Sequence, residues 1–225
     1  IVTDTIETVE TVALGVWVKV GSRHETYEIN GISHMLEHMN FRGTIRHTAS
    51  EIAEKIEAVG GHLNAYTSRE HTGYYARILK QDVSLAVDLL SDILQFSMFN
   101  IEELEREKTV VLQEISQTHD TPDDIIFDLF QETAFPSQPL GYPIIGRPDV
   151  IKSFTRQDLQ TYIEDQYTAS NTIVAAAGKI EHERFVELVS QQFTNIKNTK
   201  PNDVRQCEYK GGDLRIARDL EQAHL

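Results

Sequence analysis

Two histidines and a glutamate lie within the five-residue segment His34-Met35-Leu36-Glu37-His38. On a helix, His34 and His38 are one turn apart and project from one face, with Glu37 beside them. Two neutral imidazoles supply half of a tetrahedral zinc site, and a nearby carboxylate that is not a ligand can take a proton from water. The order reverses the zinc-binding H-E-x-x-H pattern. The segment alone equally fits a helix with two surface or capping histidines.

A third ligand for such a site is available on a second predicted helix, over residues 101–118. Leu104, Glu107, Val111 and Glu114 are spaced so that they form one stripe along it. A stripe that faces a core should be apolar, because buried carboxylates are costly unless they are paired or bound to metal. The residues alone leave open that the stripe faces solvent, or that Glu107 pairs with a lysine or arginine.

Composition limits the classes of protein to which the chain can belong. Of its 225 residues 40% are hydrophobic and 25% charged, as in soluble globular proteins, and no apolar run approaches the roughly 20 residues of a membrane span. The net charge of −14 disfavours nucleic acid and anionic membranes and suits a cationic partner or substrate, although acidity also maintains solubility. The single cysteine, Cys207, excludes an internal disulfide and a multi-cysteine zinc site.

The elements that must position these residues follow from periodicity. Alternation of Val12, Leu14 and Val16 with small or polar residues predicts a strand over 9–20. Ser50 and Asn100 are the predicted N-caps of two helices. The other elements predicted in this half are the motif helix from Asn30 to Gly43, strands at 62–67 and 72–80, and a helix over 83–96.

The second half is predicted to be mainly helical. A helix over 123–134 follows Pro122, with Ile126, Phe127 and Phe130 on its buried side. An irregular connection over 135–149, a helix over 155–166, a strand over 172–178 and a helix over 181–193 come next. The polar segment 195–212 is predicted to be a linker.

The sequence resembles the M16 (pitrilysin or insulinase) metallopeptidases, also called inverzincins. The matching stretches are residues 34–44 (HMLEHMNFRGT), residues 60–67 (GGHLNAYT), the segment from Glu107 to Glu114, and Pro139-Leu140-Gly141. The resemblance covers nearly the whole chain and is greatest to the branch that holds the mitochondrial processing peptidase β-subunit and its bacterial homologues.

The resemblance implies a zinc-dependent endopeptidase. Zn2+ is expected on His34, His38 and Glu114, with Glu37 as general base and Glu107 as a supporting residue of the catalytic site. Both histidine rings need an acceptor that fixes their tautomers, and Glu107 is the first candidate. The alternative is a non-catalytic M16-like structural or partner-binding subunit, which the intact ligand set disfavours.

The resemblance also implies the residues that hold an extended, presequence-like peptide. The peptide adds to the edge of the strand at 62–67, where Asn64 and Ala65 present backbone groups. Phe41 contacts an apolar residue just after the cut, and Asp124 and Asp128 hold an arginine two positions before it. Without the resemblance, Asn64 is an ordinary edge-strand residue, and the aspartates are first-turn residues favoured by the helix dipole.

The fold implied is α/β (α+β), with one mixed, largely antiparallel sheet flanked by helices. Residues 1–194 are expected to form the peptidase domain, 195–212 the linker, and 213–225 the start of a second M16-like domain, with Leu220 to Leu225 as its first strand. The chain is then an N-terminal fragment, weak or inactive without a second M16-like domain or subunit. Its substrate is an unfolded protein or peptide, cationic in character. Its expected location is the bacterial cytoplasm, with the mitochondrial matrix as the alternative.

Overall fold

The computed structural model describes residues 1–199, 204 and 206–217. Within them, one sheet has the strand order β1-β5-β2-β4-β3. Strand β1 pairs in parallel with β5, and all other neighbours are antiparallel. The expected mixed, largely antiparallel sheet is therefore confirmed. The strands are β1 (Val2–Thr5), β2 (Thr11–Val18), β3 (His62–Thr67), β4 (Thr72–Leu79) and β5 (Thr172–Gly178).

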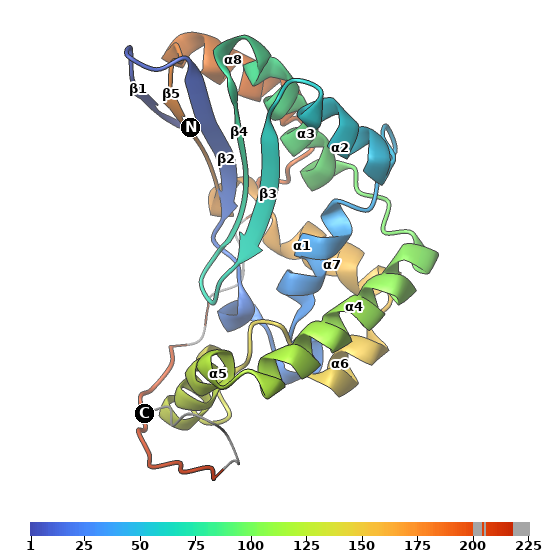
Figure 1. The fold of residues 1–225 in the computed structure, drawn as a ribbon, viewed down its shortest axis with the longest axis vertical. Coiled ribbons are helices and arrows are strands. Elements are labelled where there is room, and N and C mark those ends of the chain that lie inside the picture. Colours follow the sequence, from blue (N-terminus) through green and yellow to red (C-terminus); the bar gives the residue numbers. More distant parts are fainter. Residues whose placement is uncertain (200–203, 205, 218–225) are drawn as a thin grey trace.

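The helices gather on one side of this sheet (Figure 1). Helices α3 and α8 lie near one end of it, and α1 lies beside the lower half of β3. The long α4 packs against α1, and α5 follows it and lies below the turn that joins β3 and β4. The helices are α1 (Ile32–Asn40), α2 (Ala49–Glu57), α3 (Val83–Gln95), α4 (Ile101–Asp120), α5 (Pro122–Ala134), α6 (Pro148–Ser153), α7 (Arg156–Gln166) and α8 (His182–Gln192).

The core lies between the sheet and these helices. In β2 the alternating residues Val12, Leu14 and Val16 are buried, as a strand with one covered face requires. Met35 and Leu36 of α1 belong to the same buried cluster. The apolar side chains of α1 are therefore fixed against the core, and His34 and His38 of this helix lie against Glu114 of α4.

Several local predictions differ from the structure. Thr48, not Ser50, caps α2 and accepts a hydrogen bond from Glu51 N, whereas Asn100 caps α4 as predicted. Phe127 and Phe130 are 67% and 62% exposed, so they are not on the buried side of α5. That helix turns Ile125 inward instead, and both of its faces carry apolar residues, so periodicity did not distinguish them. The short elements β1 and α6 were not predicted.

The described part of the C-terminal segment contains no helix or strand over residues 206–217. It returns to the end of α5, where Lys210 N donates to Ala134 O at 2.9 Å and Glu208 N to Gln138 Oε1 at 2.7 Å. The predicted strand from Leu220 to Leu225 lies outside the described residues. Among the helices that are described, none has the length and apolar character needed to cross a membrane.

Candidate metal centre and active site

A buried carboxylate fixes the start of α1, the helix that carries the H-x-x-E-H segment. Gly31 takes the N-cap position with φ of 96° and has no side chain to cap the helix. Glu25 supplies the acceptors instead: its Oε2 accepts from Gly31 N at 2.7 Å and Asn30 Nδ2 at 3.0 Å, and its Oε1 accepts from Ser33 N at 2.9 Å. The helix N-terminus favours this acidic group electrostatically. No local pattern marks Glu25 as a helix cap, because its contacts depend on the folded loop.

Three potential metal donors meet where α1 crosses α4. The Nε2 atoms of His34 and His38 lie 3.7 Å and 3.6 Å from Glu114 Oε2. Ligands about 2.0–2.1 Å from a tetrahedral zinc are about 3.3 Å apart, so these donors need to move little to hold one. Within the described residues, no other group of three His, Cys, Asp or Glu side chains is close enough to share an ion. The donor set therefore fits zinc.

The surroundings of His34 keep its ring in the neutral form. Burial, together with the neighbouring His38, lowers the pKa of His34 to about 3, so this imidazole is neutral near pH 7. The neutral ring is the form that binds a metal. The Nδ1 atom of His34 is buried and has no hydrogen-bond partner among the described side chains and backbone.

Glu107 lies behind the donors and links two elements. Its side chain is almost fully buried; Oε2 lies 3.0 Å from His38 Nδ1, and Oε1 lies 2.7 Å from Arg42 Nε. A carboxylate on the far nitrogen of a metal-binding histidine fixes the ring and its tautomer. Glu107 was the candidate acceptor for both rings, and the structure places it against His38 only. It also pairs with an arginine, the alternative that the sequence left open.

Glu37 lies between the metal donors and the edge of the sheet. It is half-buried, and its Oε2 accepts a hydrogen bond of 2.6 Å from the hydroxyl of Thr67, the last residue of β3. Burial raises the pKa of Glu37 above the usual glutamate value, and the Thr67 hydrogen bond opposes this rise. A raised pKa improves a carboxylate as a general base near neutral pH. Thr67 was not predicted, because no local pattern links it to Glu37.

The predicted peptide-binding residues lie on and beside β3. This strand is an outer strand of the sheet and pairs only with β4 among the described strands. Asn64 is exposed, and its Oδ1 accepts from Ala65 N at 2.8 Å, so the amide that a peptide would use is held by a side chain. Phe41 is half-buried, with its ring centroid 6.4 Å from that of Tyr74.

The two aspartates of α5 have different environments. Asp124 is exposed, whereas Asp128 is half-buried and accepts a hydrogen bond of 2.9 Å at Oδ1 from Arg69 Nη2. Burial raises the pKa of Asp128 despite this arginine. The structure therefore does not present a free pair of carboxylates, because Arg69 of the β3–β4 turn already engages one of them.

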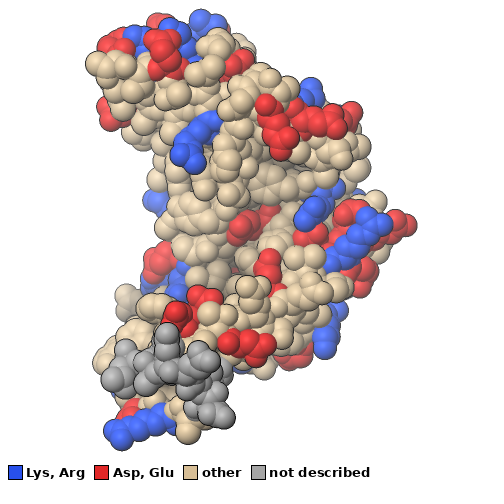
Figure 2. All heavy atoms as spheres, viewed as in Figure 1, with Lys and Arg blue, Asp and Glu red and all other residues tan. Residues whose placement is uncertain are grey.

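Figure 2 shows acidic side chains in the hollow between the sheet and helices α4 and α5.

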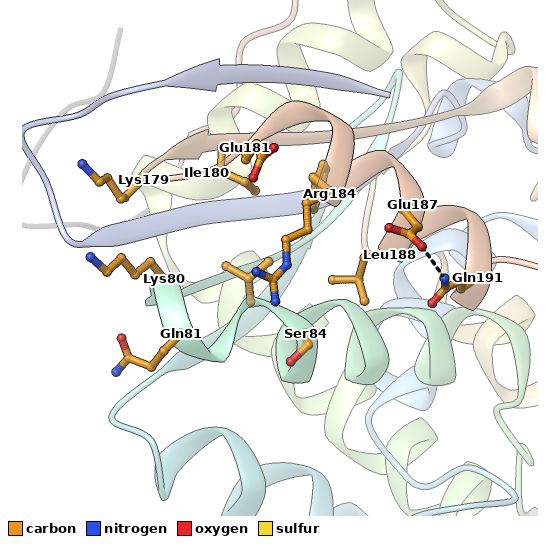
Figure 3. Close-up of a pocket in the computed structure, with 12 residues that line it drawn as sticks. Lys80, Gln81, Ser84, Lys179, Ile180, Glu181, Arg184, Glu187, Leu188 and Gln191 are labelled. Carbon is orange, nitrogen blue, oxygen red and sulfur yellow. Dashed lines mark hydrogen bonds between the residues drawn. The ribbon is translucent and has the colours of Figure 1, made fainter.

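A separate groove of about 670 Å³ lies between the start of α3 and α8. Lys80, Lys179 and Arg184 border it, and Arg184 extends into it toward Ser84 (Figure 3). The groove shares no residue with the His34, His38 and Glu114 cluster.

Comparison with known families identifies the architecture. Residues 1–148 match the model of the insulinase family, peptidase family M16. The chain belongs to this family. Residues 153–225 match the model described as the M16 inactive domain. Strand β5 of the second segment lies between β1 and β2 of the first, so the two matched segments of this M16 chain build one sheet.

Similar proteins are named as zinc proteases, as processing-peptidase subunits and as a protease. An uncharacterized zinc protease of Rickettsia felis is 42% identical over 96% of this chain and 53% of its own length. A probable mitochondrial-processing peptidase subunit beta of Arabidopsis thaliana is 44% identical over 93% of this chain and 40% of its own length. A protease from Helicobacter pylori superposes with a TM-score of 0.84 at 27% identity, over 92% of this chain and 50% of that one. The chain spans about half the length of the curated relatives it matches.

Proposed function

We propose that this M16 chain carries the zinc site of an endopeptidase that cuts extended or presequence-like peptides. The observation that carries the proposal is the meeting of His34, His38 and Glu114 around one point, with Glu37 one residue from His38. Similar proteins named as zinc proteases or processing peptidases support it. They also support a bacterial cytoplasmic or a mitochondrial matrix location as the two alternatives.

The chain's own groups have separable roles in this reaction. Bound zinc would supply the Lewis acidity that lowers the pKa of water and polarises a peptide carbonyl. Glu37 accepts the proton from the attacking water and delivers it to the leaving nitrogen. His34 stays neutral through burial, and Glu107 orients His38 through Nδ1. Glu114 adds one negative charge to the donor set.

Substrate binding is assigned to the outer edge of β3. An extended peptide adds to an unpaired edge through backbone hydrogen bonds. The carboxamide of Asn64 must leave Ala65 N for that amide to bind the peptide. Phe41 is proposed to contact the residue after the cut. Asp124 and Asp128 are proposed to hold an arginine two residues before it, with Arg69 rearranging to expose Asp128.

The metal site is tested by mutation of the zinc donors and the base separately. Glu114→Gln is expected to weaken zinc binding strongly, because it removes a charged ligand. Glu37→Gln is expected to retain zinc and lose turnover when it is made in the longer protein that includes the proposed second M16-like domain. Zinc content by metal analysis and peptide cleavage measure the two effects. Full zinc occupancy in a His34→Ala, His38→Ala double variant contradicts the ligand set.

The second candidate is a non-catalytic M16-like structural or partner-binding subunit. The match of residues 153–225 to a model named for an inactive domain favours it. Both candidates predict zinc binding, so cleavage decides between them. Stoichiometric zinc in the full-length protein, with no hydrolysis across a peptide library, supports the non-catalytic role. Hydrolysis that a chelator abolishes and zinc restores supports the peptidase.

A further inference from the structure

Thr67 connects the general base to the strand that receives the peptide. Its side chain lies on the face of β3 shared with Ala65, which is buried toward α1, while Asn64 and Tyr66 face outward. The hydroxyl lies 2.6 Å from Glu37 Oε2 and 3.5 Å from the backbone oxygen of Ser33. Since a hydroxyl has one proton, the shorter contact to a carboxylate takes it.

The hydrogen bonds that the Glu37 carboxylate accepts within the described residues come from Thr67, which donates from its hydroxyl to Oε2 and also approaches with its backbone. The last residue of β3 therefore holds the carboxylate of the base. The hydroxyl contact fixes the position of Oε2.

The backbone at Thr67 is held on several sides. Thr67 pairs with Thr72 in the β3–β4 ladder, and Ser68 N donates to His71 O at 2.8 Å. The next residue in the turn, Arg69, reaches α5 through its 2.9 Å contact with Asp128. Such anchoring makes the Thr67 hydroxyl a fixed point against which a carboxylate can be oriented.

We propose that Thr67 is a positioning residue for the general base, and this inference rests on the proposed peptidase function. By holding Oε2, Thr67 sets the rotamer in which Oε1 of Glu37 faces the attacking water. Because Thr67 ends β3, a peptide that pairs with this strand is aligned on the same backbone that orients the base. The same strand therefore positions both the substrate and the base.

The test compares Thr67→Val and Thr67→Ser in the full-length, zinc-loaded protein. Valine keeps the branched shape without the hydroxyl, and serine restores the hydroxyl. Thr67→Val is expected to lower kcat about tenfold to a hundredfold, a part of the 10²–10⁴-fold that general-base catalysis contributes, with KM within about twofold. Thr67→Ser is expected to recover most of kcat, and zinc content is expected to stay unchanged in both.

Thr172→Val is the matched control, because Thr172 is also a half-buried strand residue whose hydroxyl makes a 2.8 Å hydrogen bond, to Thr168 O, away from the site. It is expected to leave kcat unchanged. Thr67→Ala serves as a second hydroxyl-free variant if valine prevents folding. An unchanged kcat in Thr67→Val, loss of zinc from it, or no recovery with serine overturns the inference while the peptidase function stands. A wild-type protein without chelator-sensitive cleavage overturns both.

Discussion

At the scale of single residues, the environments of three glutamates separate their proposed roles. Glu107 is buried between His38 and Arg42, so its carboxylate has a fixed orientation and its negative charge is balanced by Arg42. Glu37 is half-buried and held by the Thr67 hydroxyl at Oε2, which suits a base with a fixed orientation. The Glu114 side chain is 40% exposed and lies against the two imidazoles. Similar side chains perform different chemistry when their contacts and their exposure to solvent differ.

Glu107→Gln is expected to lower zinc affinity by about tenfold to a hundredfold, the usual effect of removing a carboxylate behind a metal-binding histidine. The amide oxygen still reaches His38, but it lacks the charge that raises ring basicity and compensates Arg42. Competition titration with a chelator measures the affinity. Glu103→Gln, on the same helix but paired with Arg106 at the surface, is the control and is expected to bind like wild type. Equal affinity in all three proteins refutes the assigned role.

At the scale of elements, the site depends on how the start of α1 is held. Gly31 has a left-handed backbone, and a Cβ there would lie 2.6 Å from Gly146 Cα. Glu25 then replaces the missing capping side chain from six residues earlier in the chain. Both features fix the axial position of α1, and so the points from which His34 and Glu37 project.

Glu25→Gln is expected to reduce the free energy of unfolding by about 1–3 kcal/mol. Glutamine has one acceptor oxygen, so its NH₂ group faces the amide of Ser33 or of Gly31 and leaves a buried donor unpaired. Chemical denaturation of the metal-free chain measures the change. Glu28→Gln, in the same segment but exposed, is expected to stay within about 0.5 kcal/mol of wild type. Equal stability of the two variants shows that Glu25 does not cap the helix.

The elements show what the sequence can predict. Strand β3 was predicted with the observed bounds, and β4 and β5 within one residue, because alternation and turn residues are local signals. The helix spacing that aligns His34 with His38 is equally local. Thr67 and Arg69 were missed because their partners, Glu37 and Asp128, are distant in sequence. Glu25 was missed because its contacts with nearby residues form only when the loop before α1 folds. Phe127 and Phe130 were misplaced because hydrophobic periodicity does not show which neighbour, if any, covers an apolar face.

At the scale of the whole molecule, this chain presents an open site. The outer edge of β3 is unpaired within the described structure, and Glu114 is partly exposed. Phe127 and Phe130 of α5 are exposed to solvent. The chain also matches only about half the length of its curated relatives. These features agree with the proposal that a second M16-like domain or subunit completes the enzyme. The net charge of −14 suits the proposed cationic substrate.

The proposed substrate preference is expected of the molecule that the second M16-like domain or subunit completes. In the full-length enzyme, an Asp124→Asn, Asp128→Asn double variant is expected to lose about tenfold or more in kcat/KM for peptides with arginine two residues before the cut. Guanidinium groups bind planar carboxylates better than ammonium groups do, so lysine peptides are expected to be affected less. Cleavage of matched peptides with arginine, lysine or alanine there provides the measurement. An equal loss on all three shows that the aspartates, with Arg69, serve only structure.

The chain of residues 1–225 alone is expected to bind zinc but to hydrolyse peptides poorly. Its three donors all lie on α1 and α4, which pack together within this chain, so metal binding requires no other domain. Hydrolysis requires more, because a peptide held at one edge strand keeps much of its freedom and loses the orientation that brings reacting atoms together. Side-by-side measurement of zinc content and kcat/KM for this chain and the full-length protein separates the two requirements. Chelator-sensitive cleavage by residues 1–225 at the rate of the full-length protein contradicts the need for a second domain, whereas failure to bind zinc contradicts the independence of the metal site.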